Sequence, residues 1–178
     1  MRLFFAVELP TEVRLALGRL RGEDGDYRWV DPSSMHVTLA FLGEQSETAR
    51  GRLEQLGVVG ATSAHAVRLQ LGEAGSFGPR TAPRVLWVGL AGDLPALGAL
   101  QSTLSTLLRD AGFSLEDRPF SPHITLARRR HTARSRPIWP PSDVPQHQFT
   151  IAELILFQSQ LSPKGATYTA LGRFPLGG

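Results

Sequence analysis

The chain has 178 residues, 42% of them hydrophobic and 20% charged, which is enough for one domain with a substantial core and too few charges for a disordered chain. It contains no cysteine, which excludes disulfides, thiolate metal sites and cysteine nucleophiles. The formal net charge of +3 indicates a mild preference for polyanions. No signal peptide and no apolar stretch of ~18 residues is found, so we expect a soluble, cytoplasmic protein without a membrane segment. A monomer is expected, because nothing indicates a large exposed apolar patch.

The first half of the chain is predicted to alternate strands and helices. We expect a strand over residues 3–9, followed by a helix that Thr11 caps and whose apolar residues recur at helical spacing. A strand over residues 35–42 comes next, and Ser46 can cap the helix that follows it. Residues 66–71 alternate like a strand. Residues 72–84 are rich in Gly and Pro, so they are predicted to form a loop.

The second half repeats this order. We expect a strand over residues 85–90, a helix with Asp93 as its N-cap and Gly112 as its stop, and a strand over residues 122–127. Residues 134–145 contain four prolines and should be irregular, and two strands, 149–157 and 167–174, close the chain. Each half therefore reads strand, helix, then a strand that holds His-x-Thr-Leu. We interpret residues 1–178 as a single domain of two pseudo-symmetric lobes.

The two repeated motifs, at residues 36–39 and 123–126, are the candidate site. Because side chains alternate across a strand, His36 and Thr38 share one face, and so do His123 and Thr125. A single strand histidine is more often structural. Two copies in matching positions favour a functional pair that lies between the lobes.

The pair suits hydrolysis of a phosphodiester. Imidazole titrates near pH 6.5, so a neutral histidine can take a proton from water while a protonated one gives a proton to the leaving oxygen. The threonine hydroxyls can bind the non-bridging phosphate oxygens, and an arginine can add a bidentate contact. The arginines nearby are Arg128, Arg129, Arg130, Arg134 and Arg136, for which a solvated loop is the alternative interpretation.

Other chemistries have weaker support. Two histidines and a carboxylate can bind zinc, but neither motif contains Asp or Glu, so no metal is expected. A serine nucleophile is disfavoured, because no Gly-x-Ser-x-Gly turn is present. His65, His131 and His147 lie in turn-like contexts and are interpreted as surface residues.

These motifs resemble those of the two-histidine (2H) phosphoesterase superfamily, most closely the bacterial and archaeal RNA 2′,3′-cyclic phosphodiesterases, also called the 2′-5′ RNA ligase family. The likeness spans nearly the whole chain. Its most specific parts are His36-Val37-Thr38-Leu39-Ala40-Phe41-Leu42-Gly43 and Phe120-Ser121-Pro122-His123-Ile124-Thr125-Leu126-Ala127-Arg128. Residues 2–7, 28–30, 84–89 and 159–168 support it.

The resemblance implies a bilobal α+β fold, with two antiparallel sheets flanking a central cleft and helices outside. It implies hydrolysis of RNA 2′,3′-cyclic phosphate ends, or of nucleoside 2′,3′-cyclic phosphates, to 2′-phosphates without metal or cofactor. His36 would be the proton donor and His123 the proton acceptor, although the residues alone do not distinguish these roles. The same cleft would also suit 2′-5′ joining of RNA ends. A third hypothesis is a non-catalytic module that binds RNA ends through its arginines.

The resemblance also implies substrate-binding residues. The threonines of both motifs and Arg128 would hold the phosphate, with Arg130 as a second candidate. Phe41 and Phe120 could stack on a base, although strict alternation places Phe41 on the apolar face. Strict alternation also places Arg129 rather than Arg128 on the histidine face, so Arg128 needs a twist, a bulge or a strand end near Ala127.

Overall fold

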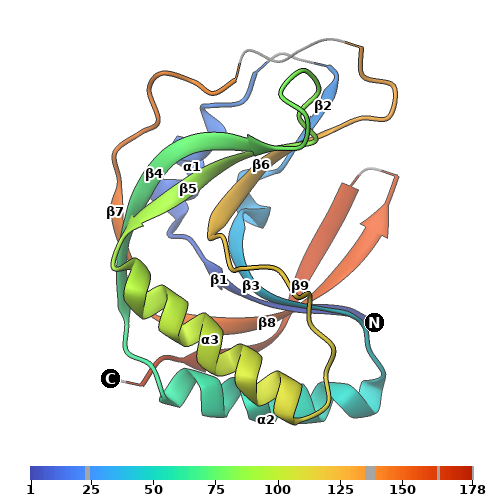
Figure 1. Ribbon diagram of the computed structural model, residues 1–178, viewed down its shortest axis with the longest axis vertical. Helices are drawn as coiled ribbons and strands as arrows, with labels where there is room; N and C mark the ends of the chain where they lie inside the picture. The colour runs from blue at the N-terminus through green and yellow to red at the C-terminus, as the bar shows by residue number, and fades with distance from the viewer. Residues whose placement is uncertain (23–24, 135–138, 164, 178) are drawn as a thin grey trace.

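The computed structural model describes residues 1–22, 25–134, 139–163 and 165–177, and it has the expected α+β composition (Figure 1). Its elements run in this order: β1 (Arg2–Glu8), α1 (Thr11–Gly18), β2 (Tyr27–Trp29), the short 3-10 helix η1 (Pro32–Ser34), β3 (His36–Glu44), α2 (Glu47–Thr62), β4 (Val67–Phe77), β5 (Val85–Gly92), α3 (Leu94–Asp110), β6 (His123–Arg129), β7 (Gln148–Ile151), β8 (Glu153–Ser162) and β9 (Gly165–Pro175).

One curled sheet organises the molecule. Within the described residues, nine strands join in the order β7-β4-β5-β6-β3-β1-β8-β9, with β2 on β6, and their pairings are antiparallel. Only Ala152 separates β7 from β8 along the chain, although these strands lie near opposite ends of the sheet order. The sheet therefore has to bend round until its two ends approach each other. Figure 1 shows the resulting half-barrel.

The expected division into two separate sheets is corrected by the hydrogen-bonding pattern. β3 and β6 pair with each other at Val37 and Ile124, and this contact joins the four strands β7-β4-β5-β6 to the four strands β3-β1-β8-β9. Some backbone hydrogen-bonding groups of β3 and β6 therefore pair with each other, so these two strands do not become unpaired sheet edges in the middle of the molecule.

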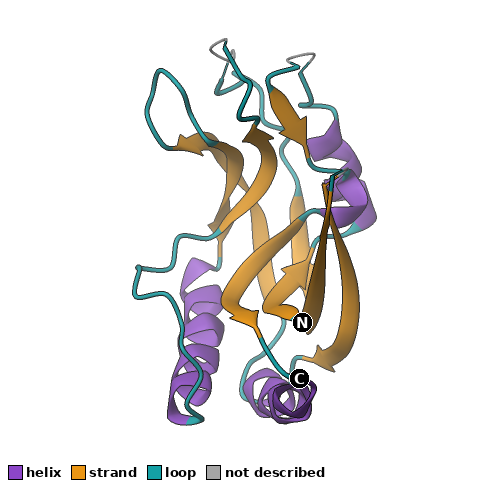
Figure 2. Cartoon of the chain, turned by 90° about the vertical axis from the view of Figure 1, so that its right-hand side faces the viewer, coloured by secondary structure: helices purple, strands orange, loops and turns teal. Residues whose placement is uncertain are grey.

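The main core lies between one face of the sheet and the helices. Leucines recur at three- and four-residue spacing along α3, and Leu97, Leu100, Leu104 and Leu108 are fully buried. α2 and α3 pack against each other at one end of the molecule (Figure 2). The opposite sheet face carries a separate small cluster around Phe4. In the described part of the chain, no helix is long and apolar enough to cross a membrane.

Most of the predicted helix boundaries are confirmed. Ser46 accepts a hydrogen bond from the Ala49 amide and Asp93 accepts one from the Ala96 amide, both at 3.1 Å. Gly112 follows α3 with a φ of 87°, a left-handed conformation that glycine adopts without strain. The prediction for Thr11 is wrong. The helix starts one residue earlier, with Pro10 at the N-cap and Thr11 already in the first turn.

The loop predicted over residues 72–84 is also corrected, because β4 continues to Phe77. Gly75 lies opposite Trp87 of β5, and a Cβ on Gly75 would come within 2.4 Å of that indole ring. Glycine here allows the close approach of an aromatic ring and does not end the strand. The single strand predicted over residues 149–157 is divided at Ala152, because β7 pairs with β4 while β8 pairs with β1.

Candidate active site

The two His-x-Thr-Leu motifs lie on neighbouring antiparallel strands. Val37 of β3 pairs with Ile124 of β6, and both side chains are 0% exposed. Because side chains alternate, the histidine and the threonine of each motif project from the opposite face of the sheet. We call this the histidine face. The structure thus brings both predicted His–Thr pairs together, related by a local two-fold axis at the Val37–Ile124 pair.

Each histidine ring is held by a backbone carbonyl two residues earlier. Nδ1 of His36 lies 2.8 Å from the Ser34 carbonyl oxygen, and Nδ1 of His123 lies 2.7 Å from the Ser121 carbonyl oxygen. A carbonyl oxygen only accepts hydrogen bonds, so Nδ1 carries the proton in both neutral rings. In both histidines this leaves Nε2 to exchange protons with a substrate.

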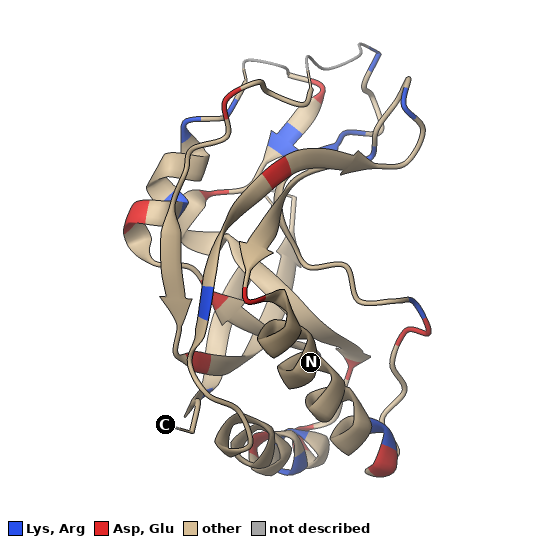
Figure 3. Ribbon diagram, turned by 60° about the vertical axis from the view of Figure 1, so that its left-hand side comes forward, with Lys and Arg blue, Asp and Glu red and all other residues tan. Residues whose placement is uncertain are grey.

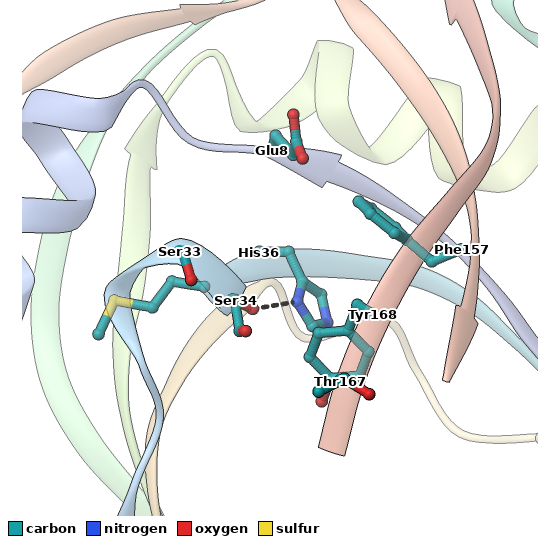
Figure 4. Close-up of a pocket in the computed structure, with 8 residues that line it drawn as sticks. Glu8, Ser33, Ser34, His36, Phe157, Thr167 and Tyr168 are labelled. Atoms are coloured by element: carbon teal, nitrogen blue, oxygen red, sulfur yellow. Dashed lines mark hydrogen bonds between the residues drawn. The ribbon is translucent and has the colours of Figure 1, made fainter. Parts of the chain in front are cut away.

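Aromatic side chains surround His36. The rings of Phe4 and Tyr168 have their centroids 5.0 Å from the imidazole, and Tyr168 meets it edge to face, at 86°. Phe157 lies further away, at 6.1 Å. A pocket of about 260 Å³ opens beside this imidazole, and its walls come from β1, β8, β9 and the turn before β3 (Figure 4). The ring is therefore fixed on one side and accessible from the pocket on the other.

A second aromatic pair flanks His123. The Phe77 ring meets the imidazole edge to face at 4.9 Å, and the Trp87 ring lies at 6.2 Å. Phe77 comes from the end of β4, within the segment that was predicted to be a loop. Both histidines thus sit against aromatic walls that come from other strands.

Equivalent irregularities in β3 and β6 decide which later residues reach the histidine face. The register of β6 against β5 shifts so that Leu126 has no residue opposite it, and β3 shifts in the same way against β1 at Leu39. Each extra residue lies three positions after its histidine. The alternation is therefore reset, and the residues five positions after the histidines, Arg128 and Phe41, turn to the histidine face.

The expectation that Phe41 follows the apolar face is therefore wrong. Phe41 is 39% exposed and stacks on Phe4 at 5.7 Å with an interplanar angle of 6°. The Arg2 guanidinium carbon also lies 5.2 Å from the centroid of the Phe41 ring. The Phe41 ring is thus partly exposed on the histidine face, and its stacking on a base stays a prediction.

The other predicted residues have different surroundings in the fold. Arg129 turns to the opposite face, where it donates to the Tyr27 hydroxyl at 3.3 Å. Arg130 is exposed beyond the end of β6, and Phe120 is half-buried against the main core. Arg136 lies outside the described residues. Substrate binding by Arg130 and Phe120 stays a prediction.

The remaining histidines lie apart from this site. His65 and His131 are exposed, and Nδ1 of His65 is 3.0 Å from the Gly177 carbonyl oxygen. His147 is half-buried rather than a fully exposed surface residue. Over residues 1–22, 25–134, 139–163 and 165–177, no three His, Asp or Glu side chains are grouped as ligands for a metal ion.

Burial is the main influence on the titration of both histidines. It lowers the pKa of His36 below the usual 6.5, and the charges of Arg128 and His123 lower it further, whereas Glu8 raises it. The pKa of His123 is also lowered, first by burial and then by Arg128. The hydrogen bonds to the backbone carbonyls oppose these effects in both rings. Both imidazoles therefore favour the neutral form at pH 7 until a negative charge enters the site.

Sequence comparisons identify the family of the chain. The sequence model of the 2′-5′ RNA ligase superfamily matches residues 9–162. The RNA 2′,3′-cyclic phosphodiesterase of Thermus thermophilus is 37% identical over 100% of this chain and 91% of its own length. Its namesake from Escherichia coli is 33% identical over 98% of this chain and 96% of its own length. The one from Geobacillus stearothermophilus is 35% identical over 97% of this chain, which spans only 56% of that protein.

Solved structures agree as well. A crystal structure of a Thermus thermophilus protein has a TM-score of 0.79 at 33% identity and covers 100% of this chain and 99% of its own. Escherichia coli LigT complexed with 3′-AMP has a TM-score of 0.78 at 30% identity and covers 98% of this chain and 97% of its own. The resemblance predicted from the two motifs is thus confirmed, and the chain belongs to the 2′-5′ RNA ligase superfamily.

Proposed function

We propose that the protein hydrolyses RNA 2′,3′-cyclic phosphate ends to 2′-phosphates, with His36 and His123 as a metal-independent acid–base pair. The observation that carries this proposal is the matched arrangement of two imidazoles on adjacent strands, each with Nδ1 bound to a backbone carbonyl and Nε2 left for proton transfer. Relatives named RNA 2′,3′-cyclic phosphodiesterase support the choice of substrate.

The reaction needs one group on each side of the phosphorus atom. Neutral His123 accepts a proton at Nε2 from the attacking water, and a new P–O bond forms. The P–O3′ bond breaks on the opposite side, and protonated His36 gives the departing O3′ its proton. The product has a 2′-phosphate and a 3′-hydroxyl. After the reaction His123 has gained one proton and His36 has lost one, so proton exchange with the solvent restores the starting state of both.

The local environments support this assignment of roles. His123 is the less deeply buried of the two rings, so water reaches it more easily. His36 lies across the β1–β3 ladder from Glu8, whose negative charge partly offsets the lowering of the His36 pKa by burial and so favours the protonated acid. The anionic phosphate adds to this effect when it binds.

The remaining side chains of the histidine face stabilise charge. The hydroxyls of Thr38 and Thr125 donate to the non-bridging oxygens, where negative charge builds up in the transition state. Arg128 adds a charge-assisted contact to the same group. A base stacks on the exposed ring of Phe41. In this proposal the domain, residues 1–178, consists of two pseudo-symmetric halves, each of which supplies one histidine strand.

The test is incubation of the protein with a nucleoside 2′,3′-cyclic phosphate in the presence of a chelator, followed by separation of the 2′- and 3′-phosphates. We expect the 2′-phosphate, and we expect His36→Ala and His123→Ala each to lower kcat by roughly 100- to 10,000-fold. The matched control is His65→Ala, since His65 is exposed and remote from both motifs. Full activity in either active-site variant, or activity that disappears with the chelator, contradicts the proposal.

Joining of RNA ends through a 2′-5′ bond is the second candidate, and the superfamily match favours it. It uses the same residues, with the 5′-hydroxyl of another RNA in place of the attacking water: a new P–O5′ bond forms, the P–O3′ bond breaks, and O3′ leaves as a hydroxyl. RNA halves with cyclic phosphate and 5′-hydroxyl ends distinguish the two reactions by their product ratio. If neither product forms and binding is sensitive to salt, the protein is instead a module that binds RNA ends.

A further inference from the structure

Two arginines face each other across the β2–β6 ladder. Arg28 is the direct register partner of Arg128, and both are exposed. Directly opposed residues project from the same face, with Cβ atoms roughly 4.5–5.5 Å apart, and like charges in that position destabilise a sheet. Since Arg128 is on the histidine face, Arg28 is on it as well. A fold that keeps such a repulsive pair beside its candidate site favours an anionic ligand there.

Neither guanidinium is neutralised by the residues that the structure describes. In the described part of the chain, no carboxylate pairs with Arg28 or Arg128. Arg28 donates a hydrogen bond to the Pro163 carbonyl at 3.2 Å, and its aliphatic stem lies beside Gly165. A guanidinium has five N–H donors, so this bond fixes the direction of the side chain and leaves most of its donors available.

The place of Arg28 in the fold gives it a different role from that of Arg128. β2 and β3 both pair with β6, β3 at Ile124 and β2 further along the strand, at residues 127–129. Arg28 therefore lies one strand away from Arg128, beyond the place where β3 and β6 pair. Its bond to Pro163 ties this strand to the β8–β9 hairpin. Figure 3 shows several Arg positions at the end of the molecule away from α2 and α3. A strand spacing of about 4.8 Å places a second cation next to the one proposed for the reacting phosphate.

We infer that Arg28 binds a second phosphate, next to the one that Arg128 contacts: the phosphodiester on the 5′ side of the terminal nucleotide. This inference rests on the proposed function, in which Arg128 contacts the cyclic phosphate. The 5′ linkage is the next charged group along an RNA end, and a guanidinium fork matches its two non-bridging oxygens. The site selects for RNA ends over free nucleoside 2′,3′-cyclic phosphates.

Three substrates test the inference: a nucleoside 2′,3′-cyclic phosphate with a 5′-hydroxyl, the same compound with a 5′-phosphate, and a trinucleotide that ends in a cyclic phosphate. We expect Arg28→Gln to raise KM for the last two by roughly 10- to 100-fold, the range of one charge-assisted hydrogen bond, and to raise KM for the first by less than about 3-fold. Arg28→Lys should restore part of the loss, because it keeps the charge but not the fork.

The matched control is Arg50→Gln, which removes the same charge from α2, where Arg50 pairs with Glu47 and Glu54. For the wild type, log KM of the trinucleotide should rise with log salt, and the slope should fall by about 0.7 in Arg28→Gln, the contribution of one phosphate contact to a single strand. Thermal unfolding of each variant shows whether the lost bond to Pro163 has altered the fold.

An equal rise in KM for all three substrates overturns the inference, as does a loss that follows the melting temperature. Both outcomes indicate a purely structural role for Arg28. Failure of the proposed function looks different, because the wild type would then turn over none of the three substrates.

Discussion

The two histidine strands have the same backbone arrangement but different surroundings. In β3 and in β6, Nδ1 of the histidine is held by a carbonyl two residues earlier, the threonine follows on the same face, and an extra residue interrupts the ladder three positions after the histidine. The side chain that this irregularity brings to the histidine face is Phe41 in one strand and Arg128 in the other.

The neighbouring strands add to the difference. His36 is the more deeply buried ring, with Phe4 and Tyr168 packed against it, and burial lowers its pKa while the carboxylate of Glu8 partly opposes that shift. His123 is less buried and has no carboxylate among the causes of its pKa shift. A nearly symmetric backbone thus carries two unlike electrostatic sites. We expect the roles of acid and base to follow from these surroundings and not from the motif, which is the same in both.

The largest expected effect is the loss of one limb of the pH profile when one histidine is removed. In kcat/KM the limb at low pH reports the base and the limb at high pH reports the acid. The residual activity of His123→Ala should lack the low-pH limb, and that of His36→Ala should lack the high-pH limb. Because burial lowers both pKa values, the wild-type profile should lie on the acid side of 6.5.

The measurement is kcat/KM for a nucleoside 2′,3′-cyclic phosphate from acid to alkaline pH, with each variant at a raised enzyme concentration. His65→Ala should reproduce the whole wild-type curve. If the two variants lose the opposite limbs, His36 is the base and His123 the acid, and the assignment based on Glu8 and burial is wrong.

A smaller effect is expected when the position five residues after the histidine is changed in β6. Arg128→Gln removes a charge-assisted contact to the phosphate, so kcat/KM should fall by roughly 10- to 100-fold. The Arg128 charge also lowers the pKa of both histidines. The low-pH limb should therefore move to higher pH in this variant, and Arg50→Gln should leave it in place. A fall in activity with an unmoved limb would mean that Arg128 lies too far from the imidazoles to affect their titration.

The sequence was informative at most positions where local chemistry decides the structure. Side-chain alternation placed the histidine and the threonine of each motif on one face, and the cap predictions for Ser46 and Asp93 are confirmed by hydrogen bonds. These features depend on residues within a few positions of each other. For the same reason the pattern of apolar residues identified most of the strands and helices.

Apart from the Thr11 cap, where Pro10 holds the N-cap position, the errors come from contacts between distant strands. The shift at Leu126 depends on how β6 lies against β5, and only this shift brings Arg128 to the histidine face. Gly75 was predicted to lie in a loop. A glycine is needed at this position because the Trp87 ring of another strand packs against it, and the local sequence does not reveal that contact. The aromatic wall of His123 was missed with it, since Phe77 belongs to the same misassigned segment.

The smallest expected effect concerns stability and compares the burial of the two histidines directly. A histidine whose pKa is lowered by folding takes up its proton in the unfolded chain first, near pH 6.5. The free energy of unfolding should therefore fall as the pH drops below about 6.5, by at most about 1.4 kcal/mol per pH unit for each such group, and level off below the folded-state pKa. Replacing a histidine with glutamine removes the contribution of that histidine to the pH dependence of the unfolding free energy.

Since His36 is the more deeply buried ring, His36→Gln should flatten the curve below about pH 6.5 more than His123→Gln does. Urea unfolding at several pH values measures the slope, with His65→Gln as the control. Equal slopes in the wild type and both variants would show that neither imidazole is desolvated enough to resist protonation, and the electrostatic difference between the two strands would then have to come from Glu8 and Arg128 alone.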